Sequence, residues 1–184
     1  HMQAQPSLAE RWEVSPNGLV WTFYLRPNLR WHDGELLTAD DAVFTLDLLR
    51  DDPLGTGKLT TLQQMVEDVT ALNSQALRVA LRRPASPLLA ELAAPILPRH
   101  LLAGVANPAQ VDLTVGSGPF QMGEQEPGHA IHLLANPHYQ PRPPRLEAVV
   151  FRIIPGEQEA AEALQDGSLL LAPVDADTAA SRPP

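Results

Sequence analysis

The first half of the chain alternates apolar and polar residues in short runs that predict strands. The aromatic and branched run at 19–25 follows a Ser-Pro-Asn-Gly turn and predicts a strand. The apolar segment 29–31 precedes a His-Asp-Gly turn and is expected to be the second strand of a hairpin-like pair. Alternating segments at 66–72 and 76–82, joined by Asn-Ser-Gln, predict a further hairpin.

A helical period begins at residue 39. Thr38-Ala-Asp-Asp41 has the form of a capping box with Asp in place of Glu, and acidic residues favour a helix start. Apolar side chains then recur every three or four residues until Asp-Asp-Pro ends the period at 51–53, so a helix over 39–51 is expected to pack on the strands. Shorter helices are expected at 59–64 and 88–94, with a turn at 99–102.

The second half predicts a third hairpin, a branched strand and one more helix. The hairpin joins 120–126 to 130–135 through Pro-Gly. The run at 149–154 is typical of a strand covered on both faces. It is followed by an amphipathic helix at 157–165 and by a strand beginning at 169–171, an order that suggests a βαβ unit and a partly parallel sheet. The predicted class is α/β, mixed α+β, with mixed sheets and several β-hairpins.

Composition narrows the possible functions. The 184 residues are 44% hydrophobic and carry a net charge of −9, which is typical of a globular protein and argues against binding of a nucleic-acid backbone. No apolar run is long enough to span a membrane. Cysteine is absent, which excludes disulfides, thiolate metal sites and cysteine nucleophiles. His1-Met2 has the form of a tag remnant, so this N-terminus carries no information on a signal peptide.

Two glycine-rich segments do not have the spacing that catalysis requires. Gly55-Thr-Gly-Lys58 lacks the spacing of a phosphate-binding loop, and Leu59 follows the lysine where Ser or Thr is needed. In Gly116-Ser-Gly118 the glycine-x-serine-x-glycine pattern of a nucleophile elbow fails because Pro119 follows Gly118, and we interpret the segment as a turn before a strand where glycine permits unusual φ. No complete catalytic set remains, so an enzyme is the weakest hypothesis.

Histidines, acidic pairs and tryptophans each allow two interpretations. His129, His132 and His138 invite a metal site, but a spacing of three on a strand places the first two on opposite faces, so surface histidines are favoured. The acidic pairs at 40–41 and 51–52 are better explained by helix capping and solvation than by cation binding. The tryptophans are more easily assigned to the core of a sheet than to a binding groove; they are Trp12, Trp21 and Trp31. We expect no metal and no cofactor.

Several segments, taken in order, resemble the family 5 extracellular solute-binding proteins of ABC transporters, which include oligopeptide, dipeptide and nickel binders. The N-terminal signature comprises Leu8-Ala-Glu-Arg-Trp-Glu-Val-Ser-Pro-Asn-Gly-Leu-Val-Trp-Thr-Phe23, Trp31-His-Asp-Gly-Glu35 and Leu37-Thr-Ala-Asp-Asp41. Further matches are Val115-Gly-Ser-Gly-Pro-Phe120, Asn136-Pro-His-Tyr139 and Val149-Val-Phe-Arg-Ile-Ile-Pro155. The sequence departs from the family pattern at Gln125, Gln140 and Ser168. The alternative of a domain without a transport role therefore stays open.

The resemblance implies a periplasmic-binding-protein-like lobe that is incomplete relative to the family's two-lobed fold. Residues 1–7 are expected to be a tag remnant and N-terminal extension, 8–173 a partial lobe, and 174–184 a disordered tail. The implied function is capture of an extracellular solute, with a peptide as the expected class, for delivery to a membrane permease. The parent is then periplasmic, or extracellular and lipid-anchored. The alternative is a sensing or interaction domain of a larger regulatory protein, which is cytoplasmic.

Position in the family-like order also implies where a ligand approaches. The loop after the first long helix contributes Thr56, Lys58 and Leu59, and a proline turn contributes Pro95 and Ile96. Loops on a rigid scaffold commonly carry function. Lys58 is the chain's only lysine, and its ammonium is a candidate partner for a ligand carboxylate.

Overall fold

The computed structural model describes residues 5–51, 60–85, 88–105, 111 and 114–172. The chain divides into two units. Unit 1 comprises His1–Gln121 and Ala135–Glu147, and unit 2 comprises Met122–Leu134 and Ala148–Pro184. Within the described residues, no helix combines the length and the apolar character needed to cross a membrane.

Unit 1 contains a four-stranded sheet in the order β1-β2-β4-β3. Its strands are β1 (Ala9–Val14), β2 (Val20–Leu25), β3 (Val66–Asn73) and β4 (Ala76–Leu81). All three pairings are antiparallel. The predicted strand at 19–25 and the predicted hairpin over 66–82 are confirmed, and the hairpin places β4 in the middle of the sheet.

The prediction that residues 29–31 pair with β2 as a second strand is wrong. Strand β2 pairs with β1 and β4, whereas Leu29–Trp31 contributes only an isolated bridge between Arg30 and Leu36. Leu29 and Trp31 instead bury their side chains in the core, and the backbone folds back on itself as Leu37 N–H donates to the Leu29 carbonyl. Strand β1 was not predicted because its sequence AERWEV carries charges at three of six positions, which obscures an apolar period.

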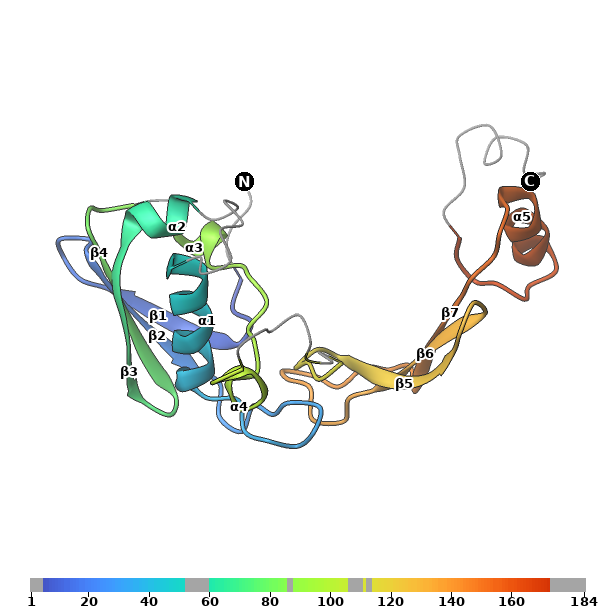
Figure 1. The fold of residues 1–184 in the computed structure, drawn as a ribbon, viewed down its shortest axis with the longest axis horizontal. Helices are drawn as coiled ribbons and strands as arrows, with labels where there is room; N and C mark the ends of the chain where they lie inside the picture. Colours follow the sequence, from blue (N-terminus) through green and yellow to red (C-terminus); the bar gives the residue numbers. More distant parts are fainter. Residues whose placement is uncertain (1–4, 52–59, 86–87, 106–110, 112–113, 173–184) are drawn as a thin grey trace. The chain divides into compact units, whose positions relative to one another are not determined.

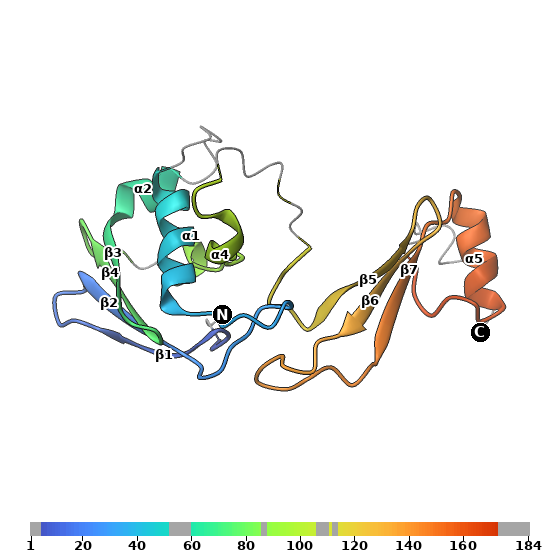
Figure 2. The same cartoon turned by 60° about the horizontal axis from the view of Figure 1, so that its bottom comes forward.

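Helix α1 (Ala39–Asp51) has the predicted bounds and lies on one side of the four-stranded sheet, as does the short α4 (Arg99–Leu102) (Figures 1 and 2). Two further helices, α2 (Thr60–Met65) and α3 (Leu88–Glu91), lie near the predicted positions, but α3 ends three residues earlier than expected. The apolar stripe of α1 packs into the core with the inner faces of β2, β3 and β4. The most deeply buried side chains of this core include Trp31, Leu62, Val66, Val79 and Leu88.

Unit 2 is built on the sheet β5-β6-β7, followed by helix α5 (Glu157–Gln165). Strands β5 (Phe120–Glu126) and β6 (Ala130–Ala135) form the predicted hairpin, and β7 (Ala148–Arg152) pairs antiparallel with β6. The acidic residues Glu157 and Glu159 occupy the first turn of α5, where the helix dipole favours negative charge. The predicted hairpin and the predicted helix are therefore confirmed.

Two expectations for unit 2 are wrong. Val150 and Phe151 of β7 are 46% and 56% exposed, so this strand is not covered on both faces. Residues 169–171 form no strand, with Leu170 97% exposed, and in the described part of the chain the sheets are antiparallel without a βαβ unit. A run of branched residues predicts extended backbone, but its burial depends on which other segment packs against it.

The core of unit 1 predicts a large difference between two leucines of the β3–β4 hairpin. Leu81, on β4, is 2% exposed, and Leu72, on β3, is 52% exposed. Leu81→Ala leaves a cavity and lowers the free energy of unfolding by about 2–5 kcal/mol. Leu72→Ala, the control, changes it by less than about 0.5 kcal/mol. Urea unfolding followed by tryptophan fluorescence measures both values, and equal effects of the two substitutions would contradict this assignment of the core.

Candidate functional site

A groove of about 960 Å³ lies in unit 1 between the N-terminal segment and the segment that follows α3. Pro95 and Ile96, two of the site residues expected from sequence, line it. The other three, Thr56, Lys58 and Leu59, lie outside the described residues. The full lining is Gln5, Ser7, Leu8, Ala9, Trp12, Phe23, Leu25, Leu37, Ala42, Leu46, Leu77, Leu89, Ala90, Leu92, Ala93, Ala94, Pro95 and Ile96.

The lining of this groove is almost entirely apolar. Its floor is made by core side chains of the sheet and of α1, such as Phe23, Leu77 and Leu46. Trp12 adds an aromatic wall, which places it partly in the groove and partly against the core, whereas Trp31 is a core residue as expected. None of the described lining residues is charged. Such a surface suits an apolar group and offers no ionic contact to a charged one.

A buried polar pair on α1 fixes the segment that carries Pro95 and Ile96. The Asp41 carboxylate accepts hydrogen bonds from the backbone N–H of Thr38 at 2.8 Å and of Arg99 at 3.0 Å. The Thr45 hydroxyl donates to the Asp41 carbonyl at 2.8 Å and accepts from the Leu97 N–H at 2.9 Å. Both side chains are buried, Asp41 at 5% and Thr45 at 1% exposure. Residues 97–99 are thus tied to α1 next to the groove.

The sequence predicted the contact of Asp41 with Thr38 but not its contact with Arg99. The capping interpretation of the acidic pair at 40–41 is confirmed by the bond from Thr38 N–H to Asp41. The contact with Arg99 spans 58 residues and has no local signal. A usable signal was the position of Thr45, a polar residue within the apolar stripe of α1, because a buried hydroxyl requires a partner.

An ion pair joins the turn after Trp31 to α4. His100 Nε2 lies 2.7 Å from Asp33 Oδ2, and both side chains are about 30% exposed. Burial raises the pKa of Asp33, but hydrogen bonds from His100 and from the Glu35 N–H outweigh it, so the pKa lies below its usual value. The Asp33 carboxylate therefore stays ionised at a lower pH than an unperturbed aspartate does.

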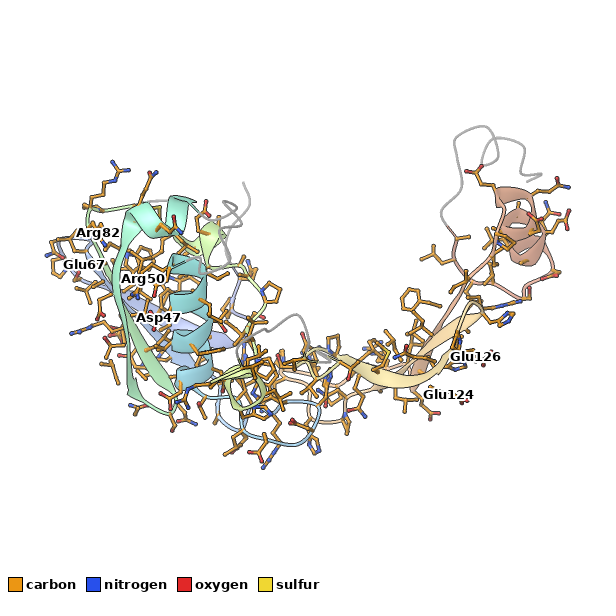
Figure 3. The ribbon with its side chains drawn as sticks, viewed as in Figure 1. Asp47, Arg50, Glu67, Arg82, Glu124 and Glu126 are labelled. Atoms are coloured by element: carbon orange, nitrogen blue, oxygen red, sulfur yellow. The ribbon has the colours of Figure 1, made fainter. Side chains whose placement is uncertain are left out.

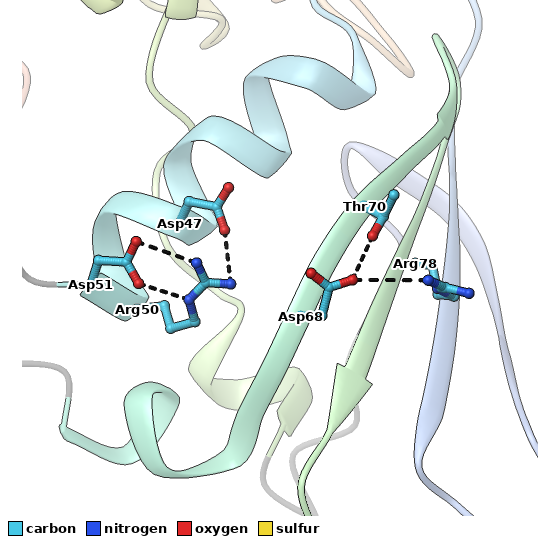
Figure 4. Close-up of polar contacts among 6 residues, drawn as sticks. All are labelled: Asp47, Arg50, Asp51, Asp68, Thr70 and Arg78. Atoms are coloured by element: carbon cyan, nitrogen blue, oxygen red, sulfur yellow. Dashed lines mark hydrogen bonds and ion pairs between the residues drawn. The ribbon is translucent and has the colours of Figure 1, made fainter.

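Some of the other charged side chains form pairs near the surface, among them Asp47 and Arg50 on α1 (Figure 3). On α1, Arg50 lies 3.0 Å from Asp47 and 2.8 Å from Asp51, and on the hairpin Thr70 donates to Asp68, which faces Arg78 at 3.8 Å (Figure 4). Burial raises the pKa of Asp47, while the neighbouring Arg50 lowers it in part. Exposed pairs of this kind contribute little to stability, and none of them points into the groove lining.

The histidines of the β5–β6 hairpin do not take part in a metal-binding group among the described residues. His132 Nε2 lies 3.2 Å from Glu126 on the neighbouring strand. Over the described ranges, no three His, Asp or Glu side chains stand close enough together to hold a metal ion. Gly116 and Gly118 do lead into β5 as predicted, but neither has positive φ, so the predicted reason for glycine is wrong there. A Cβ on Gly116 would lie 3.3 Å from the His32 ring, and close approach explains this glycine.

The family model of the bacterial extracellular solute-binding proteins, family 5 (middle), matches residues 3–182. The chain belongs to this family. The family resemblance seen in the sequence is thereby confirmed, and the mixed α/β fold of this chain corresponds to part of the fold of periplasmic binding proteins.

Relatives and solved structures agree with this assignment. The chain is 31% identical to the dipeptide-binding protein of Escherichia coli over 173 residues, covering 82% of this chain and 32% of the relative. It matches the periplasmic binding protein DppA of Helicobacter pylori, solved with the peptide STSA, at 27% identity and a TM-score of 0.76, over 90% of this chain and 37% of that one. MoaA of Agrobacterium tumefaciens R10, solved with mannopinic acid, matches at 32% identity and a TM-score of 0.75, over 91% and 35%. The chain spans about a third of the length of these relatives.

The buried carboxylate of α1 leads to a prediction about stability. Asp41→Asn replaces one acceptor oxygen with an NH₂ group that faces a backbone N–H, so the free energy of unfolding falls by about 1–3 kcal/mol. Asp40→Asn, on the exposed neighbour, is the matched control and changes it by less than about 0.5 kcal/mol. Thermal unfolding at neutral pH measures both; an undisturbed Asp41→Asn variant would show that its hydrogen bonds do not hold the 97–99 segment.

The Asp33–His100 pair predicts a pH dependence on the acid side. Because the folded pKa of Asp33 is depressed, its contribution is present above the unfolded value of about 3.9 and is lost as pH falls through the folded pKa. Asp33→Asn therefore lowers the free energy of unfolding at pH 6 by at most about 1 kcal/mol and has no effect at the acid end. Urea titrations between about pH 6 and pH 2, with exposed Glu67→Gln as control, measure the difference; a constant offset at every pH would contradict the pairing.

Proposed function

We propose that this chain is part of the substrate-binding protein of an ABC transporter, which captures an extracellular solute and delivers it to a membrane permease. The observation that carries the proposal is the family match over residues 3–182. Members of the family are solute-binding proteins, so the proposed activity is reversible binding without chemical conversion. A periplasmic or lipid-anchored extracellular location belongs to the same proposal, and nucleic acid has no part in it.

A peptide is the proposed class of ligand. The E. coli relative is named for dipeptides, and the H. pylori protein was solved with a peptide. The A. tumefaciens protein, solved with mannopinic acid, has the higher identity of the two structures, so ligand class varies among proteins this similar. A peptide is favoured here because the peptide-binding relatives also match in sequence over most of this chain.

We place the ligand-approaching residues on two segments, Thr56, Lys58 and Leu59 on one and Pro95 and Ile96 on the other. Support for the second segment comes from its place in the lining of the apolar groove and from the bonds that fix residues 97–99 to α1. A segment held in this way presents its apolar side chains at low entropic cost. The partial lobe is proposed to span residues 8–173.

Binding by chains of two lengths tests the proposal. Calorimetric titration of di- and tripeptides into a protein of full family length that contains this chain is expected to give one-to-one binding. The 184-residue chain alone is expected to bind at least about a hundredfold more weakly, since it spans about a third of the relatives and encloses less ligand surface. A submicromolar one-to-one complex with the 184-residue chain would contradict the incomplete-site proposal, and binding of a non-peptide solute alone would contradict the ligand class.

The lysine proposal predicts a selective loss of affinity. In the family-length protein, Lys58→Ala is expected to weaken a peptide with a free C-terminal carboxylate by about 1–3 kcal/mol, because a charge-assisted hydrogen bond is lost. The C-terminally amidated peptide is expected to lose much less. Arg83→Ala, an exposed cation beyond the end of β4, is the control variant. Equal affinity of wild type and Lys58→Ala for the free carboxylate would remove Lys58 from the site.

A further inference from the structure

His32 holds the backbone that leads into β5 through both nitrogens of its ring. The Gly116 N–H donates to His32 Nδ1 at 3.1 Å, and His32 Nε2 lies 3.1 Å from the Gly118 carbonyl oxygen. These contacts connect positions 84 and 86 residues apart in the sequence. The backbone of the two segments is joined as well, since His32 N–H donates to the Gly116 carbonyl at 2.8 Å.

These two contacts define the protonation state of the ring. A carbonyl oxygen only accepts, so His32 Nε2 must carry a proton, and Nδ1 must be bare because it accepts from an N–H. The ring is therefore the neutral Nε2–H tautomer. A second proton would place Nδ1–H against the Gly116 N–H, two donors facing each other, while the Nε2 contact would survive.

Asn136 completes the same cluster from the returning segment. Its Nδ2 donates to the Gly118 carbonyl at 3.0 Å, its backbone N–H donates to the Pro119 carbonyl at 2.9 Å, and its side chain is 3% exposed. The chain passes from unit 1 to unit 2 after Gln121 and returns at Ala135. The cluster of His32, Gly116, Gly118 and Asn136 therefore lies near the unit 1 ends of the first two of the three passages between the units.

The neighbouring histidine has the opposite requirement. His100 Nε2 faces the Asp33 carboxylate, which only accepts, so this pair needs a protonated nitrogen, whereas the bond from the Gly116 N–H needs a bare His32 Nδ1. A second proton on the His32 ring is therefore incompatible with its contact with the Gly116 N–H, whereas a proton on each ring nitrogen of His100 is compatible with its contact with Asp33. The described part of the segment before β5, residues 114–119, carries no titratable side chain. The titratable or charged residues on the other elements of the cluster are Arg30, Asp33 and Glu35 on the loop of His32, Arg99 and His100 on α4, and His138 and Tyr139 after Asn136.

We propose that His32 is a proton-operated latch, which holds the Gly116 N–H when the ring is neutral and releases that N–H when the ring is protonated, while the bond from the His32 N–H to the Gly116 carbonyl remains. Histidine is the side chain whose charge ordinarily changes between about pH 5 and pH 8, and this range sets the conditions of the test. Gly116 is suited to it, since a Cβ there would lie 3.3 Å from His32 Cε1 and 3.6 Å from Nδ1. The proposal is independent of the ligand.

The tautomer can be tested in the unmodified chain. Long-range ¹H–¹⁵N NMR spectra of the imidazole nitrogens at about pH 8 are expected to show His32 with a protonated Nε2 and a bare Nδ1. The Nδ1–H tautomer, or a ring that is already cationic at this pH, would overturn the proposal whatever the behaviour of any variant.

Release is tested at the Gly116 amide, with the protein labelled with ¹⁵N-glycine at its 11 glycines. Between about pH 8 and pH 5 its hydrogen exchange, corrected for the intrinsic effect of pH, is expected to accelerate about tenfold, the loss of one hydrogen bond. His32→Asn keeps an acceptor oxygen near the Nδ1 position but cannot titrate, so the acceleration is expected to vanish. His100→Asn removes the neighbouring ion pair and is expected to keep it. Acceleration that persists in His32→Asn, or that vanishes in His100→Asn, would overturn the proposal.

Discussion

Burial of the inner face of the four-stranded sheet by α1 is the constraint on which the rest of unit 1 depends. Strands β2, β3 and β4 contribute Phe23, Val69 and Val79 to this face, and a stripe of small and branched side chains of α1 packs against them. The stripe also buries Asp41 and Thr45, whose polar atoms cannot reach water and must find partners inside the protein. They find them in the backbone of residues 97–99, so the path of that segment follows from the way the helix is buried.

Stability is unevenly distributed between the two units. Of the described residues of unit 2, only Ala130 and Ala160 are buried apolar side chains, whereas the core of unit 1 includes Trp31 and several leucines. Hydrophobic stabilisation is proportional to the apolar area removed from water, so unit 1 accounts for most of it. Local opening is therefore expected first in unit 2, whose strand β7 keeps Val150 and Phe151 exposed.

Local patterns predicted the elements that local forces determine. The period of α1, the turn residues of the β3–β4 and β5–β6 hairpins and the length of α5 were all readable in the sequence. Strand β1 was not predicted because its charged residues hide the apolar period. Residues 29–31 were wrongly assigned to a strand because an apolar run does not determine whether its backbone joins a sheet. The contacts of Arg99 with Asp41 and of Gly116 with His32 join positions 58 and 84 residues apart, where no spacing rule applies.

The chemistry of the groove limits what it can recognise. A free peptide carries a charge at each terminus, and a desolvated charge needs a partner of opposite sign. The described lining offers none, so in the proposed function the groove is suited to an apolar side chain and not to the peptide termini. Recognition of the termini then has to come from groups outside this lining, and the ammonium of a lysine such as the proposed Lys58 is chemically suited to the carboxylate end. Separation of an apolar subsite from the ionic contacts would allow side chains of different shape to bind while the termini set the register of the ligand.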